Sequence, residues 1–320
     1  MNDNQTNKSI KELSKLSDFL AVKYLALDWF IVFMTIYLAI SYDSLLFNVL
    51  AIIIIGSRQH AIGIISHDAV HYRLLKNRKM NELVGNVFTA FPLFITLPGF
   101  RSMHLRHHSK VNTSDDPDLV RREGKSDWIF PMTKKNLYIM LFLDISGLNL
   151  YQNIQKIFLP KSDKKLREDF KRLPKSFYLG QLCFYIMNFG LISYFEVWET
   201  YFLFWIVPYF TWFKFIKRLR AIGEHFAIND TGFDEITRTT LVGFFEKHLI
   251  TPHNINFHIE HHYHAAVPFY NLEKLHDVLI NNGKLHKMGK VQIDGYLIGV
   301  LNETQGDLHM PKNTQKKASI

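Results

Sequence analysis

PHNINFHIEHHYHAAVP, residues 252–268, is the stretch that decides how this chain folds. It holds five of the 16 histidines in a sequence of 320 residues. His258, His261 and His262 follow the spacing i, i+3, i+4, which places three imidazoles on one face of a helical turn. Imidazole is a common metal ligand. The spacing therefore predicts a metal site, and the other ligands must fold toward it.

One earlier cluster repeats this spacing in full, and another repeats part of it. HLRHH places His104, His107 and His108 at i, i+3, i+4, and HDAVH places His67 and His71 at i, i+4. Surface or helix-capping histidines are the alternative interpretation, and three similar clusters in one chain argue against it. An isolated His225 in RAIGEH is a ninth candidate, although a hydrogen-bonded core histidine has the same appearance. The candidate ligands are His67, His71, His104, His107, His108, His225, His258, His261 and His262.

The number of imidazoles bears on the kind of metal site. One zinc ion is satisfied by four ligands, or by three and a water molecule. Nine nitrogen donors are enough for two metal ions with four or five imidazoles each. Iron, zinc, copper and nickel all bind imidazole, so the spacing leaves the metal open. HExxH, the motif of a zinc protease, does not occur in the sequence.

Long apolar runs indicate that the solvent of this chain is a lipid bilayer. Hydrophobic residues make up 48% of the sequence, and 27 residues are Phe. Four runs approach the ~20 residues that a membrane-spanning helix needs. We expect transmembrane helices at about 25–42, 45–66, 177–195 and 201–217, and a re-entrant or interfacial segment at 83–100, where Pro92 and Pro98 interrupt the apolar run.

The resulting fold class is an all-α integral membrane protein. Four transmembrane helices carry a cytosolic helical cap, and the cap holds a histidine-rich site for two metal ions. We expect a single domain over residues 1–320, with a disordered polar tail from about 303.

Basic residues set the expected orientation in the membrane. The first 24 residues are polar and Lys-rich and lack a signal-peptide pattern, and KFIKRLR at 214–220 follows the fourth run. The loops SYDS and EVWET carry no Lys or Arg. Both termini and every histidine cluster are therefore expected in the cytosol. A net charge of +9 is explained by basic residues that flank apolar spans and attract membrane lipids, so nucleic acid is not an expected partner.

Three single residues also allow predictions. Cys183, the sole cysteine, excludes a disulfide framework and is expected as a small buried apolar side chain. Arg58, inside an apolar run, is expected to contact a substrate headgroup or to extend to the membrane interface. His276 is expected to be exposed to solvent.

HDAVH, HLRHH and HIEHH, in this order and separated by apolar spans, resemble the three histidine boxes of the integral-membrane fatty acid desaturase superfamily. That superfamily also contains membrane alkane hydroxylases and carotenoid hydroxylases and ketolases. The resemblance covers about residues 60–279 and includes His225 as the histidine between the last span and the third box. VPFYNL after HIEHH is similar to the segment that follows the third box in many lipid desaturases.

The resemblance implies a non-haem di-iron centre with two iron ions (Fe²⁺/Fe³⁺) and O₂ as co-substrate. It implies an oxygen-dependent desaturase that acts on a lipid or acyl substrate by C–H abstraction. Because no haem-binding HPGG segment occurs, the electrons would come from a separate donor, a ferredoxin, a rubredoxin or a cytochrome b5-like protein. It further implies an Asn that reaches one metal through water, with Asn254 as the candidate.

Two alternative functions stay open at this stage. One is a hydroxylase or ketolase of the same superfamily that acts on an alkane, a carotenoid or another apolar molecule. The other is a histidine-rich membrane metal transporter, although the clusters lie at span ends rather than at mid-membrane. Three carboxylates next to candidate ligands are expected to orient imidazoles: Asp68, Glu224 and Glu260. Because neighbouring residues on a helix diverge by about 100°, at least one of the three is expected to be a salt-bridge partner instead.

Overall fold

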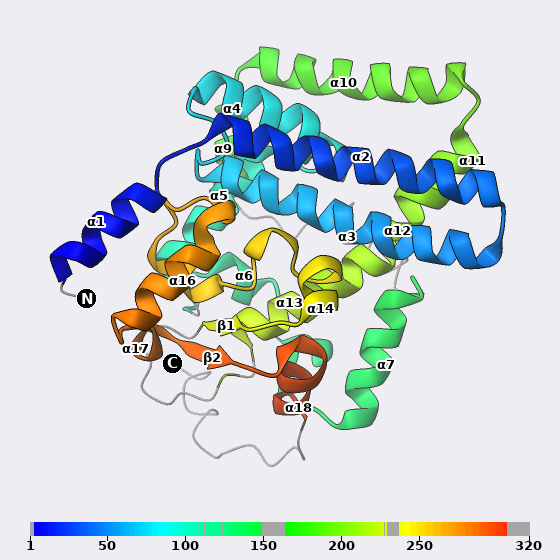
Figure 1. Cartoon of the computed structure of the whole chain (residues 1–320). Coiled ribbons are helices and arrows are strands. Elements are labelled where there is room, and N and C mark those ends of the chain that lie inside the picture. The colour runs from blue at the N-terminus through cyan, green and yellow to red at the C-terminus, as the bar shows by residue number, and fades with distance from the viewer. Residues whose placement is uncertain are drawn as a thin grey trace.

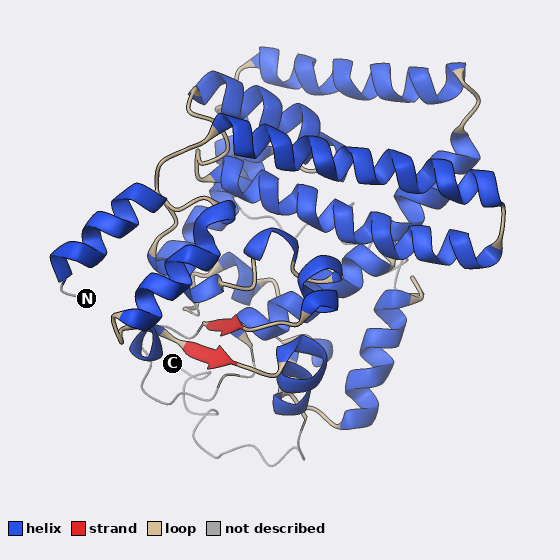
Figure 2. Ribbon diagram, viewed as in Figure 1, coloured by secondary structure: helices blue, strands red, loops and turns tan. Residues whose placement is uncertain are grey.

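The computed structural model describes residues 3–111, 113–122, 124–148, 164–226, 228 and 237–305. Helices dominate it, and the longest of them lie side by side along one side of the molecule (Figure 1). Shorter helices and loops gather beneath them (Figure 2). The second and third histidine clusters lie on shorter helices, and the first lies at the end of one of the long ones. Most of the tail that was expected to be disordered lies outside the described residues.

Two long helices form a hairpin, α2 (Asp18–Tyr42) and α3 (Leu45–Val70). Serine side chains cap both, since Ser17 Oγ accepts from Leu20 N–H and Ser44 Oγ accepts from Phe47 N–H. Asp43 adopts a left-handed conformation with φ of 38° and ends α2. Both helices are long and apolar enough to cross a membrane, which agrees with the predicted spans at 25–42 and 45–66.

The predicted re-entrant segment is a bent pair of helices. α4 (Arg78–Gly85) continues through η1 (Asn86–Ala90) and η2 (Phe91–Leu93), and α5 (Leu97–Lys110) follows at an angle of 89°. Phe94 turns the chain with a positive φ of 58°, and Thr96 Oγ1 caps α5. This pair is either one broken span or a re-entrant loop.

The two later spans differ from the prediction. α10 (Lys175–Tyr194) covers the third run, whereas the fourth is divided among α11 (Trp198–Tyr201), η4 (Phe202–Ile206), α12 (Val207–Phe210) and α13 (Trp212–His225). The backbone stays helical from the π-helical turn through Pro208, and the helix is interrupted at Thr211, whose φ of −114° and ψ of −94° are not helical. In the described part of the chain two helices qualify as spans, or three with the bent pair, so four transmembrane helices are not confirmed.

The remaining elements form the cap. It contains the helices α1 (Asp3–Leu13), α6 (Pro117–Val120), η3 (Ser126–Trp128), α7 (Lys134–Ile145), α9 (Lys164–Lys171), α14 (Phe244–Leu249), η5 (Pro252–Asn254), α15 (His258–Tyr263), η6 (Phe269–Asn271), α16 (Leu272–Asn281), α17 (Leu285–Met288), η7 (Gly295–Val300) and α18 (Leu301–Glu303).

The all-α prediction needs a small correction. β1 (Arg238–Thr240) and β2 (Lys290–Gln292) pair in parallel, with Arg238 opposite Lys290. Each strand has three residues, which is too short for an alternating apolar pattern to show in the sequence. The strands stabilise the cap because β1 also supports α15, as Ile259 N–H donates to Thr239 Oγ1 at 3.0 Å.

Buried polar contacts join the hairpin to the segment that begins at Pro252. Asp28 on α2 accepts from Arg58 on α3 at 3.0 Å, and its second oxygen lies 2.6 Å from His253 Nε2. Arg58 also donates to the carbonyl of His248 at 2.6 Å. Its guanidinium thus holds the fold together, and the headgroup and interface predictions for Arg58 are not supported.

Cys183 is exposed on α10, so the prediction that it is buried is wrong.

The chain start lies at the same end of the hairpin as the third histidine cluster. α1 packs against α16 (Figure 1). Ser17 N–H donates to Tyr270 Oη at 2.8 Å, and the amide of Asn271 donates to the carbonyl of Leu13 at 2.8 Å. These contacts place the N-terminal helix and HIEHH on one side of the molecule.

Candidate metal centre

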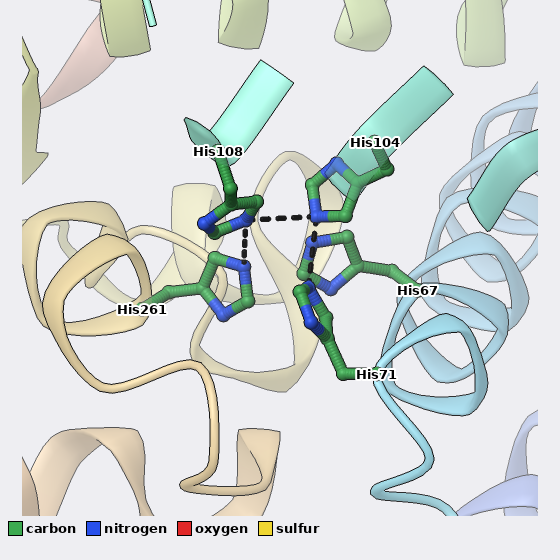
Figure 3. A group of neighbouring side chains, drawn as sticks. All are labelled: His67, His71, His104, His108 and His261. Atoms are coloured by element: carbon green, nitrogen blue, oxygen red, sulfur yellow. Dashed lines mark hydrogen bonds between the residues drawn. The ribbon is translucent and has the colours of Figure 1, made fainter. Parts of the chain in front are cut away.

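Five histidines from three helices converge on one point. His67 and His71 come from the end of α3, His104 and His108 from α5, and His261 from α15 (Figure 3). One ring nitrogen from each lies within 4.8 Å of those of all the others. We call these residues the five-histidine group.

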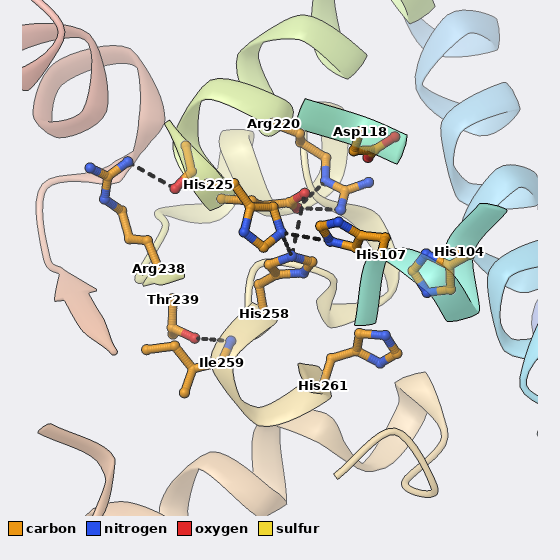
Figure 4. Close-up of polar contacts among 12 residues, drawn as sticks. His104, His107, Asp118, Arg220, His225, Arg238, Thr239, His258, Ile259 and His261 are labelled. Atoms are coloured by element: carbon orange, nitrogen blue, oxygen red, sulfur yellow. Dashed lines mark hydrogen bonds and ion pairs between the residues drawn. The ribbon is translucent and has the colours of Figure 1, made fainter. Parts of the chain in front are cut away.

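A second set of four histidines lies next to the first. His107 comes from α5, His225 ends α13, and His258 and His262 come from α15. Figure 4 shows three of them together, with His225 Nε2 at 3.1 Å from His107 Nε2 and at 2.8 Å from His258 Nε2. We call these residues the four-histidine group. The rings of His108 and His262 stack across the two groups with centroids 4.3 Å apart.

The geometry of a helix explains why each triplet serves both groups. Residues four apart are offset by about 40° around the helix, whereas residues three apart are offset by about 60° in the opposite direction. On α5, His104 and His108 therefore point to the five-histidine group and His107 to the other. On α15 the roles are reversed, since His258 and His262 belong to the four-histidine group. The sequence prediction of a single face was too simple.

The nitrogen spacing suits ligands that share a cation. The closest Nε2 pairs within the two groups are 2.8 to 3.1 Å apart. With metal–nitrogen bonds of about 2.1 Å, ligands at right angles lie about 3.0 Å apart and tetrahedral ligands about 3.4 Å apart. The arrangement thus fits five- or six-coordinate metal ions better than tetrahedral zinc.

Hydrogen bonding alone does not satisfy the five-histidine group. His104 Nε2 lies 2.9 Å from both His71 Nε2 and His108 Nε2, and His108 Nε2 lies 3.0 Å from His261 Nε2. A neutral imidazole Nε2 has either one proton or one lone pair, so at most two of these three contacts are hydrogen bonds. A cation among the four nitrogens accepts all four lone pairs.

Burial favours the neutral form of most of these imidazoles, which is the form that binds a metal. His107 is the exception, because the effect of burial is outweighed by its hydrogen bond to Asp116, which raises the pKa of His107 above the usual value. Burial, followed by repulsion between neighbouring imidazoles, holds the pKa of His258, His261 and His262 well below the usual value. Burial, followed by the charges of Arg73 and Arg101, lowers the pKa of His71 to about 4. The residues fit two metal ions, one in each group, and the ligand roles of the nine histidines stay predictions.

Asp116 is a carboxylate that sequence reasoning missed. Its Oδ1 lies 2.9 Å from Nδ1 of His107, and both side chains are buried. A carboxylate on Nδ1 fixes the tautomer and the ring orientation, so that Nε2 keeps its lone pair and would be the atom that holds a metal ion. Oδ1 also accepts from Asp118 N–H at 2.8 Å and caps α6. The available signal was TSDDPD at 113–118, which follows HLRHH within one short turn.

Two of the predicted orienting carboxylates make other contacts. Asp68 accepts from the backbone N–H of Phe269 at 2.9 Å, while its other oxygen is 3.9 Å from His67 Nδ1, too far for a hydrogen bond. Glu224 pairs with Arg220 at 2.7 Å, and its second oxygen is 3.8 Å from His258 Nε2. Both stand near the histidines without a hydrogen bond to the neighbouring candidate ligand.

Glu260 supports the third cluster from the side away from the metal groups. It is fully buried, accepts from Thr239 Oγ1 at 2.5 Å and pairs with Nδ1 of His276. His276 is buried by this contact, so the prediction of an exposed His276 is wrong. Asn254 adopts a positive φ of 59° and donates to the carbonyl of Phe269 at 3.3 Å, and its role at the metal stays a prediction.

A cavity of about 480 Å³ opens beside the histidines. His67, His104 and His107 form part of its wall. Apolar side chains from four segments form much of the rest, among them Ile64, Leu93, Phe100, Phe213 and Ile255. A volume in the range of ~300–1,000 Å³ with mostly apolar walls is typical of small-molecule sites. The cavity therefore offers an apolar molecule a site beside both histidine groups, which we call together the metal groups.

Comparison with known proteins gives the same picture. The profile of the family "Fatty acid desaturase" matches residues 43–292. The dihydrorhizobitoxine desaturase of Bradyrhizobium elkanii is 26% identical over 277 residues, which cover 84% of this chain and 78% of that protein. The sn-1 acyl-lipid omega-3 desaturase (ferredoxin) of Nostoc sp. (strain 36) is 24% identical over 75% of this chain and 69% of its own length.

A plant protein shows a similar degree of likeness. The chloroplastic omega-6 fatty acid desaturase of Brassica napus is 23% identical over 71% of this chain and 52% of its own length. The family match spans all three histidine clusters and the intervening His225. Both the clustered histidines and the sequence match lead to one conclusion: the chain belongs to the fatty acid desaturase family of membrane oxidoreductases.

Proposed function

We propose that this protein is an oxygen-dependent desaturase that inserts a carbon–carbon double bond into an acyl or lipid substrate. The observation that carries the proposal is the pair of adjacent histidine groups, with five and four members, in contact with an apolar cavity. In this proposal the nine histidines hold two iron ions. Nitrogen spacing near 3 Å supports iron over tetrahedral zinc, since iron accepts five or six ligands.

The reaction removes two hydrogens from neighbouring carbons. The two hydrogens, one O₂, two electrons and two protons leave as two water molecules when the double bond forms. Bound iron supplies the oxygen activation and the removal of hydrogen that no side chain performs on an unactivated C–H bond. Two electrons come from a separate protein, and a ferredoxin, a rubredoxin or a cytochrome b5-like protein has the required chemistry.

The chain's own residues bind, orient and shield. Phe100, Phe213 and Ile255 enclose the substrate chain and exclude water from the reacting carbons. His67, His104 and His107 lie in the cavity wall, so the carbons that pass them are those that react. Asp116 holds the proton on Nδ1 of His107 and keeps Nε2 directed toward its group. Glu260 and His276 hold α15 in place from behind.

The membrane arrangement follows from the same proposal. His71 and His104 meet although residues 83–100 lie between them in sequence, so that segment returns to the level at which it starts. This return supports the re-entrant interpretation of residues 83–100. We place both termini and the metal centre in the cytosol, where lysine-rich segments favour that side, and treat residues 1–320 as one domain.

Metal content and product mass test the proposal together. Purified protein should contain about two irons per chain and consume O₂ when a reduced ferredoxin and an acyl lipid are supplied. A product that has lost two hydrogens supports the desaturase. A product that has gained one oxygen atom identifies a hydroxylase or ketolase instead. Zinc without O₂ consumption would overturn the oxidoreductase proposal and favour a metal-transport role.

A further inference from the structure

The cavity beside the histidines carries more positive than negative charge in its wall. Four cationic side chains line it, together with one carboxylate. Charged groups in a largely apolar cavity are costly unless they are paired or bind a ligand of opposite charge. The lining residues that carry charge are Arg121, Arg122, Lys217, Arg220 and Asp118.

Two of the cations pair with carboxylates, and a third, Arg121, donates to Met103 Sδ at 3.1 Å. Arg122 lies 3.5 Å from Asp118 and stacks against the Trp128 ring. Arg220 pairs with Glu224 and also donates to His60 Nε2 at 2.8 Å. Figure 4 shows Arg220 and Asp118 on the same side of the His107 ring. These two arginines are therefore largely neutralised by neighbouring carboxylates.

Lys217 is different. Its side chain keeps accessible surface and lines the cavity. The ammonium lies 5.2 Å from the centre of the Phe213 ring, and no carboxylate of the described residues lies within ion-pairing distance. An ammonium that faces a cavity without a carboxylate partner is a binding group for an anion.

The order of residues along α13 places this ammonium between the apolar wall and the metal groups. Phe213, Lys217 and Arg220 line the cavity in succession, and His225 of the four-histidine group ends the helix. At 1.5 Å per residue, the Cα of Lys217 lies about 12 Å along the helix axis from that of His225. A molecule with an anionic end at Lys217 and an apolar body against Phe213 matches this order.

We propose that the cavity selects substrates with an anionic group, a carboxylate or a phosphate, which Lys217 binds inside the cavity with Arg220 beside it. The substrate class is then an anionic amphiphile whose charge enters the protein, rather than a neutral lipid. This inference rests on the proposed function for the reaction that follows binding, although binding itself requires no turnover. Lys217 is a specificity-determining residue in this scheme.

Direct binding to the purified, metal-loaded protein in an uncharged detergent tests the inference. The probes are octanoate, octyl phosphate and octanol, which share one apolar chain and differ in the charged end, and the measurement is isothermal titration calorimetry. We expect the better anion to bind at least tenfold more tightly than octanol. Lys217→Met should remove that difference, while Lys217→Arg keeps it. Lys247→Met is the control, since Lys247 is a partly exposed lysine that pairs with Glu273 away from the cavity.

The outcomes separate this inference from the proposed reaction. Equal affinity of wild-type protein for all three probes, or unchanged anion affinity in a folded Lys217→Met variant, overturns the inference. Thermal unfolding of each variant shows whether it is folded. Charge-selective binding by a protein that forms no unsaturated product would contradict the proposed reaction and leave the anion site intact. The tighter of the two anions identifies the group that the cavity accepts.

Discussion

Asp116→Asn tests how the four-histidine group is held. Asp116 Oδ1 is 2.9 Å from His107 Nδ1, and it also accepts from Asp118 N–H at 2.8 Å. Asparagine caps helices about as well as aspartate, so the cap on α6 should survive the substitution. What is lost is the negative charge that fixes the His107 tautomer and makes its Nε2 a stronger ligand.

The expected effect is a selective loss of metal. Removing a group that orients a metal ligand costs ~10–100-fold in metal affinity, which corresponds to about 1.4–2.7 kcal/mol. We expect this loss only in the four-histidine group, because Asp116 makes no described contact with a member of the five-histidine group. In the Asp116→Asn variant the bound metal should therefore fall from about two ions per chain to about one as the chelator concentration rises. Wild-type protein should keep both ions at the same chelator concentration.

Metal analysis after dialysis against graded chelator concentrations measures this directly. Asp115→Asn is the matched control, since Asp115 is the exposed neighbour of Asp116 in the same turn. Thermal unfolding checks that the Asp116→Asn variant is folded. Equal retention of both metals in the variant, or parallel loss of both, would refute the assignment of Asp116 to the His107 imidazole.

Three further predictions follow from the geometry. His107→Ala should abolish turnover while the protein still inserts in the membrane, because it removes a member of the four-histidine group; retained activity in a lipid-product assay would exclude His107 from the ligands. Removing the metal with a chelator should lower the melting temperature, since a metal that binds only the native state stabilises it by about 2.7 kcal/mol when the free metal is at 100-fold excess over Kd. Scanning fluorimetry with and without added iron measures the melting temperature, and an unchanged melting temperature would contradict a preformed metal centre. Gly223→Ala should destabilise the protein by about 1–3 kcal/mol, because an added Cβ would overlap the Tyr296 ring, whereas Gly180→Ala on the open face of α10 should not. Denaturant unfolding compares the two variants, and an equal free energy of unfolding would refute the packing argument.

Much of the site was predictable because its pattern is local. The i, i+3, i+4 spacing of HLRHH and HIEHH is a property of a single helical turn, and the apolar runs of α2 and α3 are each long enough to read without a partner. The candidate ligands therefore stand out in the sequence, as do the first two spans. Basic residues near span ends further suggested that the clusters lie on one side.

Side-chain partners that come from neighbouring elements were not predictable. Asp116 contacts His107 and His276 contacts Glu260 because consecutive helices fold back on each other, and no helical spacing rule encodes those contacts. The break at Thr211 and the exposure of Cys183 also depend on how the later helices pack.

By itself the sequence determined which residues could bind metal and that the chain needs a membrane, because both follow from residue type and spacing along one helix. Only the tertiary structure decided that each triplet divides between two groups, that Asp116 orients His107, and that Lys217 faces the cavity. The physical reason is that a helix sets the angle between its own side chains, whereas the point at which those side chains converge depends on the packing of other helices.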